Sequence, residues 1–128
     1  MPQDKRPSIL GVGNDIIEID RIRDSIKAHG RRFLDRIFTP KEQEYCLNHQ
    51  DSAPRFAGRF AAKEAIAKAL GTGFGEQLSW LDIEILANGE GRPMATLSER
   101  LNAKFHHPTI SLSISHCKSY VTAVAIWS

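Results

Sequence analysis

Two acidic residues, Asp15 and Glu64, are the first candidates for chemistry in this sequence. Asp15 follows the stretch Gly11-Val-Gly-Asn, where we expect the backbone to leave a first strand. Glycines there let another backbone or a phosphate group approach closely, and a carboxylate at a strand end is well placed to hold a hard cation. Taken alone, Asp15 is more simply explained as a loop acid or a helix cap. The pattern Gly11-x-Gly13 lacks the third glycine of a dinucleotide-binding loop.

Glu64 lies in an alanine-rich segment together with several bases. Phe60, Glu64 and Lys68 are spaced four residues apart, so they share one face of a helix. Arg59 and Lys63 share the adjacent face. One explanation is a solvated surface, on which a Glu64–Lys68 pair contributes ~0.3 kcal/mol. The other is a metal–phosphate site, in which the acid holds the cation and the bases neutralise the remaining phosphate charge. The spacing alone favours the first and leaves the second open.

His116 ends a segment in which apolar Ile110, Leu112 and Ile114 alternate with serines. This period of two predicts a strand, and a histidine at its end is either part of a site or an exposed turn residue. The neighbouring Ser115 raises the question of a serine hydrolase. There is no G-x-S-x-G elbow, and adjacent strand residues point to opposite faces, so the sequence argues against that activity. The remaining histidines have no zinc-binding spacing.

A set of bases lies early in the chain: Arg21, Arg23, Lys27, Arg31, Arg32 and Arg36. Arg21, Arg32 and Arg36 alternate with apolar residues, which predicts an amphipathic surface with a positive exterior. Such a surface is either ordinarily solvated or docks an acidic protein or a nucleic acid. Few aromatic residues lie among these bases, which weakens the interpretation as a single-strand nucleic-acid site.

The elements that must position these residues can be predicted from periodicity and from start and stop signals. In chain order they are a strand at 8–13, a helix starting near 19, a basic-apolar turn at 31–38, helices at 39–49 and 54–70, strands at 80–86 and 94–96, a helix at 98–105, and strands at 110–115 and 120–127. The clearest start is Thr39-Pro40-Lys41-Glu42, which combines a capping box with proline at the first helical position. Asp20 is the expected cap of the first helix, and Gly71 ends the longest one. The order predicts an α+β fold, an antiparallel-rich sheet with helices packed on one face.

Length and composition bound the class of protein. The 128 residues fit one domain, 1–128, with 1–7 as a flexible N-terminal extension. A net charge of +2 argues against a general nucleic-acid-binding protein but permits local basic patches. Cys46 and Cys117 make neither a zinc motif nor a disulfide framework, which suits free thiols in a reducing compartment. No stretch approaches the ~20 apolar residues of a membrane span, and the N-terminus lacks the apolar core of a secretory signal. We therefore expect a cytoplasmic protein that does not enter a membrane.

Three segments together carry a resemblance to a known family. They are Gly11-Val-Gly-Asn-Asp15-Ile-Ile-Glu18-Ile, Arg59-Phe-Ala-Ala-Lys63-Glu64-Ala-Ile-Ala-Lys68-Ala-Leu-Gly71-Thr-Gly73 and Ser113-Ile-Ser-His116. In order and spacing they resemble the three signatures of holo-[acyl-carrier-protein] synthase, the short trimeric type of 4′-phosphopantetheinyl transferase. The resemblance covers residues 8–127, and the long central segment is its most specific part. It shifts the interpretation of Asp15 and Glu64 from surface acids to a metal site.

The resemblance implies an activity and a set of residues for it. The activity is transfer of 4′-phosphopantetheine from coenzyme A to a serine of apo acyl carrier protein in fatty acid biosynthesis, with release of 3′,5′-ADP. Asp15 and Glu64 are implied to hold Mg²⁺, or Mn²⁺ in its place, and to be catalytic; Glu64, or a water that it orients, is the candidate base. The residues implied to bind coenzyme A are Arg59, Lys68, Gly71, Arg92, Pro93, Ser115 and His116. Those implied to receive the acidic carrier protein are Arg21, Arg32 and Arg36.

The same resemblance implies a homotrimer with active sites between subunits. Larger phosphopantetheinyl transferases contain two related halves, whereas this chain has one copy of each signature and no internal repeat, so the rest of the cleft should come from another subunit. The alternatives differ in class. A non-catalytic module that binds coenzyme A or a carrier protein should lack one of the two acids, and a nucleic-acid-binding protein should bind with a steep salt dependence. A relative that modifies peptidyl or polyketide carriers also stays open.

Overall fold

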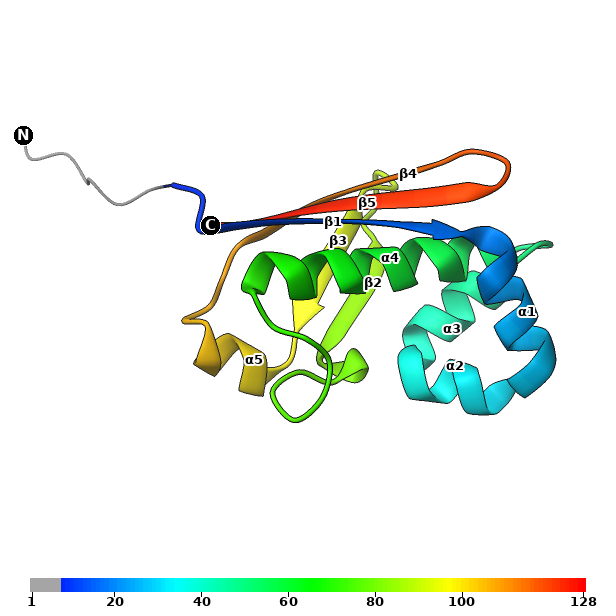
Figure 1. Cartoon of the computed structure of the whole chain (residues 1–128), viewed down its shortest axis with the longest axis horizontal. Coiled ribbons are helices and arrows are strands. Elements are labelled where there is room, and N and C mark those ends of the chain that lie inside the picture. The colour runs from blue at the N-terminus through cyan, green and yellow to red at the C-terminus, as the bar shows by residue number, and fades with distance from the viewer. Residues whose placement is uncertain (1–7) are drawn as a thin grey trace, which may run out of the picture.

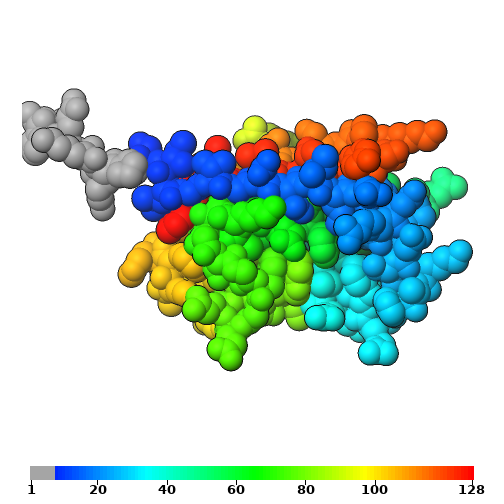
Figure 2. Space-filling model, in the orientation of Figure 1, coloured from blue at the N-terminus to red at the C-terminus, as the bar shows by residue number. Residues whose placement is uncertain are grey.

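The computed structural model describes residues 8–128 as an α+β fold, with a three-stranded antiparallel sheet on one side and helices on the other (Figures 1 and 2). The predicted fold class is confirmed. The sheet has the order β1-β5-β4, with β1 at Gly11–Glu18, β5 at Tyr120–Trp127 and β4 at Ile110–His116. A separate antiparallel hairpin consists of β2 (Ile83–Ala87) and β3 (Pro93–Leu97). The extension expected at 1–7 lies outside the described residues.

The helices are α1 (Ile19–His29), α2 (Arg31–Ile37), α3 (Pro40–Leu47), α4 (Ala53–Leu70) and α5 (Glu99–Lys104), with a 3₁₀ turn, η1, at Trp80–Asp82. The start of α3 is as predicted: the Thr39 hydroxyl accepts from the Glu42 backbone N–H at 3.2 Å, and the Glu42 carboxylate accepts from the Thr39 N–H at 2.9 Å. Gly71 ends α4 in the left-handed conformation, with φ 75°, which glycine adopts without strain.

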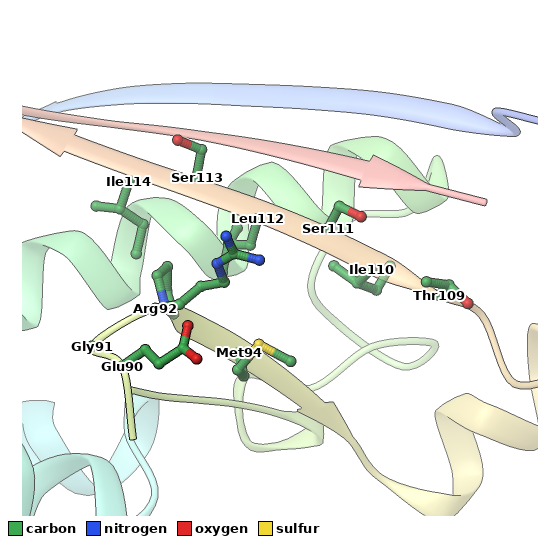
Figure 3. Close-up of a pocket in the computed structure, with 11 residues that line it drawn as sticks. Glu90, Gly91, Arg92, Met94, Thr109, Ile110, Ser111, Leu112, Ser113 and Ile114 are labelled. Carbon is green, nitrogen blue, oxygen red and sulfur yellow. The ribbon is translucent and has the colours of Figure 1, made fainter. Parts of the chain in front are cut away.

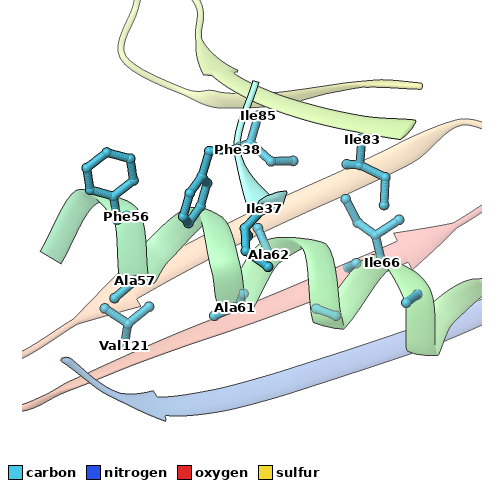
Figure 4. Close-up of a cluster of buried hydrophobic side chains, with 14 of the residues drawn as sticks. Ile37, Phe38, Phe56, Ala57, Ala61, Ala62, Ile66, Ile83, Ile85 and Val121 are labelled. Atoms are coloured by element: carbon cyan, nitrogen blue, oxygen red, sulfur yellow. The ribbon is translucent and has the colours of Figure 1, made fainter. Parts of the chain in front are cut away.

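Helix α4 is the centre of the molecule, because it packs against the sheet on one side and the β2–β3 hairpin on the other (Figure 4). Its alanines, among them the fully buried Ala57 and Ala61, let the backbone lie close to β5 at Val121. On its other side Ile66 packs toward Ile83 of β2. Close packing on both sides of the helix therefore fixes the position of the residues that α4 carries.

Strand β1 approaches α4 more closely than any side chain larger than hydrogen would allow. A Cβ built on Gly13 would lie 2.0 Å from the Ala65 carbonyl oxygen, and one on Gly11 would lie 2.0 Å from the Ala69 carbonyl oxygen. The prediction that these glycines end the first strand is therefore wrong. The strand runs on through Asp15 to Glu18, because the glycines serve close packing against the helix.

Gly13→Ala is expected to lower the free energy of unfolding by about 3 kcal/mol, since the new methyl group must push β1 away from α4. Urea unfolding measures the loss, and Gly89→Ala is the matched control because a Cβ there meets no atom within 4 Å. Equal stability of the two variants would contradict the close packing that the structure assigns to Gly13.

Two further expectations about local structure are wrong. The segment expected as a turn at 31–38 contains helix α2, because Leu34 and Ile37 both turn inward and are buried. Asp20 lies in the first turn of α1 rather than at its N-cap, which is Glu18. Asp20 still favours the helix, since a carboxylate in the first turn interacts well with the helix dipole.

Candidate functional site

Asp15 lies in the middle of β1, paired with Ala123 of β5. Because side chains alternate along a strand, Asp15 points to the same side as Gly13, toward α4, and is half-buried. The strand-end position expected from the sequence is therefore wrong, although the carboxylate does face the helix that carries Glu64. The glycines matter here because they bring β1 close enough to α4 for the two acids to share one cavity.

Glu64 lies on the face of α4 that borders this cavity, which has a volume of about 370 Å³. Asp15, Glu64, Phe60 and Arg21 all line it, so a strand, the central helix and helix α1 contribute to one site. Burial raises the pKa of Glu64, the negative charge of Asp15 raises it further, and Lys68 opposes them. Two carboxylates that repel one another in one cavity form a donor set suited to a hard divalent cation.

Lys68 connects the two sides of the site. Its ammonium donates to Asp15 Oδ1 at 3.2 Å and to the Asn14 backbone carbonyl at 3.0 Å. The predicted shared face of Phe60, Glu64 and Lys68 is thus confirmed as one side of the cavity and its margin. Within residues 8–128, no three His, Cys, Asp or Glu side chains gather closely enough to hold a metal ion by themselves.

The adjacent face of α4 does not join this site. Lys63 is fully buried, and Arg59 is only 6% exposed. The Arg59 guanidinium lies over the Tyr45 ring, 4.3 Å from its centroid, and Arg59 Nε has no hydrogen-bond partner among the described residues. The interpretation that several bases of α4 project at a single site with Glu64 is therefore wrong for Arg59 and Lys63, because helical spacing gives direction but not depth.

The predicted carrier-binding bases fall in two neighbouring places. Arg21 lines the cavity of the two acids, while Arg32 and Arg36 line a smaller cavity of about 210 Å³ with His29. Phe33 lines both cavities and connects them. Sequence reasoning missed Phe33, although its helical spacing from Arg36 and Ile37 was a usable signal once 31–37 is taken as a helix.

A larger cavity, about 700 Å³, lies between the β2–β3 turn and β4 rather than at the two acids (Figure 3). Arg92 and Pro93 line it, and the Arg92 side chain extends from the turn toward β4 near Leu112. The chemistry argues against placing the reaction here, because Glu90 of the turn is the one acid among residues 8–128 that lines this cavity.

The other predicted residues lie at the ends of elements. His116 is the last residue of β4 and borders a cavity of about 420 Å³ that Arg55 and Lys118 also line. Ser115 is exposed and points away from α4, to the opposite side from Ile114. Gly71 lies at the C-terminus of α4. Sequence reasoning missed Arg55, whose position one helical turn before Arg59 was the available signal.

Glu64→Gln is expected to stabilise the metal-free chain at neutral pH and to have no such effect in acid. The raised pKa means that the folded chain holds the Glu64 proton more tightly than the unfolded chain, so stability falls as pH rises from the ordinary glutamate range through the folded value. Glutamine does not ionise, so the variant does not lose stability in this way as pH rises. Urea unfolding of both proteins in EDTA across this pH range tests it, and a difference that does not vary with pH would contradict the assignment.

Comparison with known proteins gives this geometry a context. The family model described as the 4′-phosphopantetheinyl transferase superfamily matches residues 11–125. The holo-[acyl-carrier-protein] synthase of Protochlamydia amoebophila is 56% identical over 119 residues, covering 93% of this chain and 98% of that one. The Helicobacter pylori enzyme of the same name, solved with coenzyme A, is 38% identical with a TM-score of 0.84 and covers 91% of this chain and 99% of that one. The Bacillus anthracis holo-(acyl-carrier-protein) synthase, solved in complex with CoA (3′,5′-ADP), is 36% identical with a TM-score of 0.81. That match covers 93% of this chain and 96% of that one.

The matched region includes both carboxylates, the whole of α4 and the β4–β5 corner, so it spans every part of the geometry described above. The chain belongs to the 4′-phosphopantetheinyl transferase superfamily, and its relatives there are holo-[acyl-carrier-protein] synthases.

Proposed function

We propose that this protein transfers the 4′-phosphopantetheine group of coenzyme A to a serine of apo acyl carrier protein, as a step of fatty acid biosynthesis. The observation that carries the proposal is the meeting of Asp15 and Glu64 in one cavity, with Lys68 at its margin. That arrangement belongs to a chain whose relatives are named for this reaction, two of them in complex with coenzyme A.

In the reaction, the serine hydroxyl oxygen attacks the β-phosphorus of the coenzyme A diphosphate. A new P–O bond forms, the bond from that phosphorus to the bridging oxygen breaks, and 3′,5′-ADP leaves with the electron pair. Glu64 takes the serine proton, directly or through an intervening water. Most of the catalytic effect comes from positioning and charge stabilisation.

The donor set fits a divalent ion, Mg²⁺ or alternatively Mn²⁺, held by Asp15 and Glu64. Mg²⁺ typically takes one or two protein carboxylates and completes its octahedral shell with substrate phosphates and water, which agrees with a site that offers two carboxylates. When bound, the ion would offset the negative charge of the diphosphate. Lys68 supplies further positive charge at the same place.

Contacts to the rest of coenzyme A are assigned to basic and turn residues around the fold. They are Arg59, Lys68, Gly71, Arg92, Pro93, Ser115 and His116. Ser115 points away from α4, and Arg92 lines the cavity by the β2–β3 turn rather than the cavity of the two acids. One coenzyme A molecule reaches all of them most readily when neighbouring subunits each contribute a part. Separate placement on one chain therefore supports active sites between subunits.

Carrier-protein docking is assigned to Arg21, Arg32 and Arg36. These exposed arginines lie beside the acids' cavity and beside its neighbour, with Phe33 between them. An acidic protein bound there would be steered by charge, and its serine would be delivered next to Glu64. A nucleic acid is the weaker partner, since the total charge is only +2.

A homotrimer is the assembly that the outer face of the sheet favours. Within residues 8–128, no helix covers this face (Figure 1). Val12 and Ile16 of β1 are 61% and 64% exposed there, and Tyr120 and Val124 of β5 are exposed beside them. An exposed apolar strip of this kind marks an interface. We assign this interface to further copies of the chain, because the residues assigned to coenzyme A lie in separate places on one chain.

Ile16→Glu is expected to disrupt the trimer, because each interface would bury a charge without a partner. Analytical ultracentrifugation should give three times the 14.3 kDa chain mass for the parent protein and a single chain mass for the variant. Leu47→Glu on α3, where the leucine is 50% exposed, is the control that should stay trimeric. A fully active monomeric parent protein would contradict the proposed assembly.

The cell interior is the proposed location. Cys117 is an exposed free thiol and Cys46 a buried one, which suits a reducing compartment such as the cytoplasm. In the part of the chain from residue 8 onward, no helix is both long and apolar enough to cross a bilayer.

The proposal is tested by incubating the protein with an apo acyl carrier protein, coenzyme A and Mg²⁺, and weighing the carrier by mass spectrometry. The expected result is a carrier heavier by one phosphopantetheine, and no gain when EDTA is present. A folded protein that binds coenzyme A but modifies none of several carriers would instead be a non-catalytic binding module, and the two acids would then be structural.

A further inference from the structure

Lys68 occupies the position beside Asp15 that a cation would take. Its ammonium donates to Asp15 Oδ1 at 3.2 Å and to the Asn14 carbonyl at 3.0 Å, so two of its three N–H groups already have oxygen partners. Both acceptors belong to β1, and the helix that carries Lys68 also carries Glu64. In the free chain the carboxylate of Asp15 is therefore already neutralised by a neighbour from the same site.

The two members of this ion pair differ in how freely they can move. The Asp15 side chain is only 19% exposed, whereas the Lys68 side chain is 53% exposed. Asp15 is fixed by the strand and its contact with α4, while the long lysine side chain extends toward solvent and can turn away from Asp15 without moving the backbone. Within residues 8–128, Glu64 makes no hydrogen bond or ion pair, so Lys68 satisfies one acid of the two.

We propose that Lys68 is a resident counter-cation that competes with the divalent ion for Asp15 in the free protein, so that the ion binds tightly only together with the diphosphate of coenzyme A. The inference rests on the proposed function, because it assumes that coenzyme A enters this site. Two carboxylates, one of them paired with lysine, make a weak site for a divalent ion. A diphosphate supplies new oxygen ligands to the ion and a new anionic partner for Lys68, so both cations are satisfied at once.

The proposal makes binding of the two ligands strongly cooperative. Because coupling between two ligands is reciprocal, the ion should strengthen binding of coenzyme A by the same factor by which coenzyme A strengthens binding of the ion. Removal of the lysine ammonium should change this coupling in a defined direction. The ion should gain affinity in the absence of coenzyme A and gain less from its addition.

The test is a titration of Mn²⁺ followed by the electron paramagnetic resonance signal of the free ion, with the parent protein and with Lys68→Met. Without coenzyme A, we expect Lys68→Met to bind Mn²⁺ about ten-fold more tightly, since repulsion between two nearby cations is removed. With coenzyme A present, the parent protein should gain more affinity for Mn²⁺ than the variant does. Lys41→Met is the control, because Lys41 is exposed on α3 away from the acids, and Lys68→Gln repeats the test with a polar side chain.

Unchanged or weaker binding of Mn²⁺ alone by both Lys68 variants, with folding verified by circular dichroism, would overturn the proposal. So would a parent protein that binds Mn²⁺ as tightly without coenzyme A as with it. These outcomes are separate from failure of the proposed function, which is read from the mass of the carrier protein. A parent protein that modifies the carrier while its Lys68 variants leave Mn²⁺ binding unchanged keeps the function and loses only this inference.

Discussion

Glu64→Gln is expected to reduce transfer of phosphopantetheine by about 10²–10⁴-fold, the range that general acid–base catalysis contributes. The amide has nearly the same shape as the carboxylate, but it carries no negative charge for the cation and accepts no proton. Glu64 also has no hydrogen bond or ion pair to other described residues, so the substitution breaks neither kind of interaction within residues 8–128. The loss should therefore appear in turnover of a protein that remains folded.

The measurement is the rate of carrier modification under saturating coenzyme A and Mg²⁺, followed by mass spectrometry. Glu44→Gln is the matched control, because Glu44 is an exposed glutamate on α3 and lies outside the cavity of the two acids. Circular dichroism and unfolding in EDTA should show the Glu64 variant at least as stable as the parent at neutral pH. Normal turnover would remove Glu64 from the catalytic machinery.

Local signals predicted much of the fold, because they act within a few residues. The capping box at Thr39, the left-handed Gly71 and the alternation from Ile110 to Ile114 each describe a structure that one segment forms by itself. The prediction failed at Gly11 and Gly13, where local reasoning takes glycine as a strand breaker. Glycine is needed at these positions because β1 lies against backbone carbonyls of α4, about fifty residues later in the chain. The residues next to the two glycines carry no signal for this contact.

The candidate site was also predicted where local spacing determines it, and not where it depends on contacts between distant segments. The spacing of Phe60, Glu64 and Lys68 placed them on one side of a helix, and the structure agrees. That Asp15 meets Glu64 could not follow from spacing, because it depends on the packing of β1 on α4. Only the resemblance to a family connected the two acids before the structure did.

Lys63 shows most clearly that helical spacing does not predict burial. It directly precedes Glu64, yet it is fully buried, whereas Glu64 lines the cavity. Its ammonium is fully buried and donates to Glu42 Oε1 at 2.7 Å, to the Ile37 carbonyl at 2.7 Å and to the Trp80 carbonyl at 3.1 Å. Burial lowers the pKa of Lys63, while the negative charge of Glu42 and its hydrogen bond act against this. The lysine thus connects α4 to α2, α3 and η1.

Lys63→Met is expected to lower the free energy of unfolding by about 3–5 kcal/mol, the usual cost of removing one member of a buried ion pair. Glu42 would be left fully buried, with the Thr39 and Ile85 backbone N–H groups as its remaining partners. The double variant Lys63→Met/Glu42→Gln should recover part of the loss, since it removes the unpaired charge as well. Urea unfolding at neutral pH measures all three proteins.

The exposed pair of Arg23 and Asp51 is the control for this prediction. Its N–O distance is 2.7 Å, the same as in the buried pair, yet Arg23→Met should change stability little because water solvates both charges. Burial rather than distance therefore decides the size of the effect. If Lys63→Met were no more destabilising than Arg23→Met, or if the double variant were less stable than Lys63→Met alone, then the buried charges would not be what holds α2 and α3 against α4.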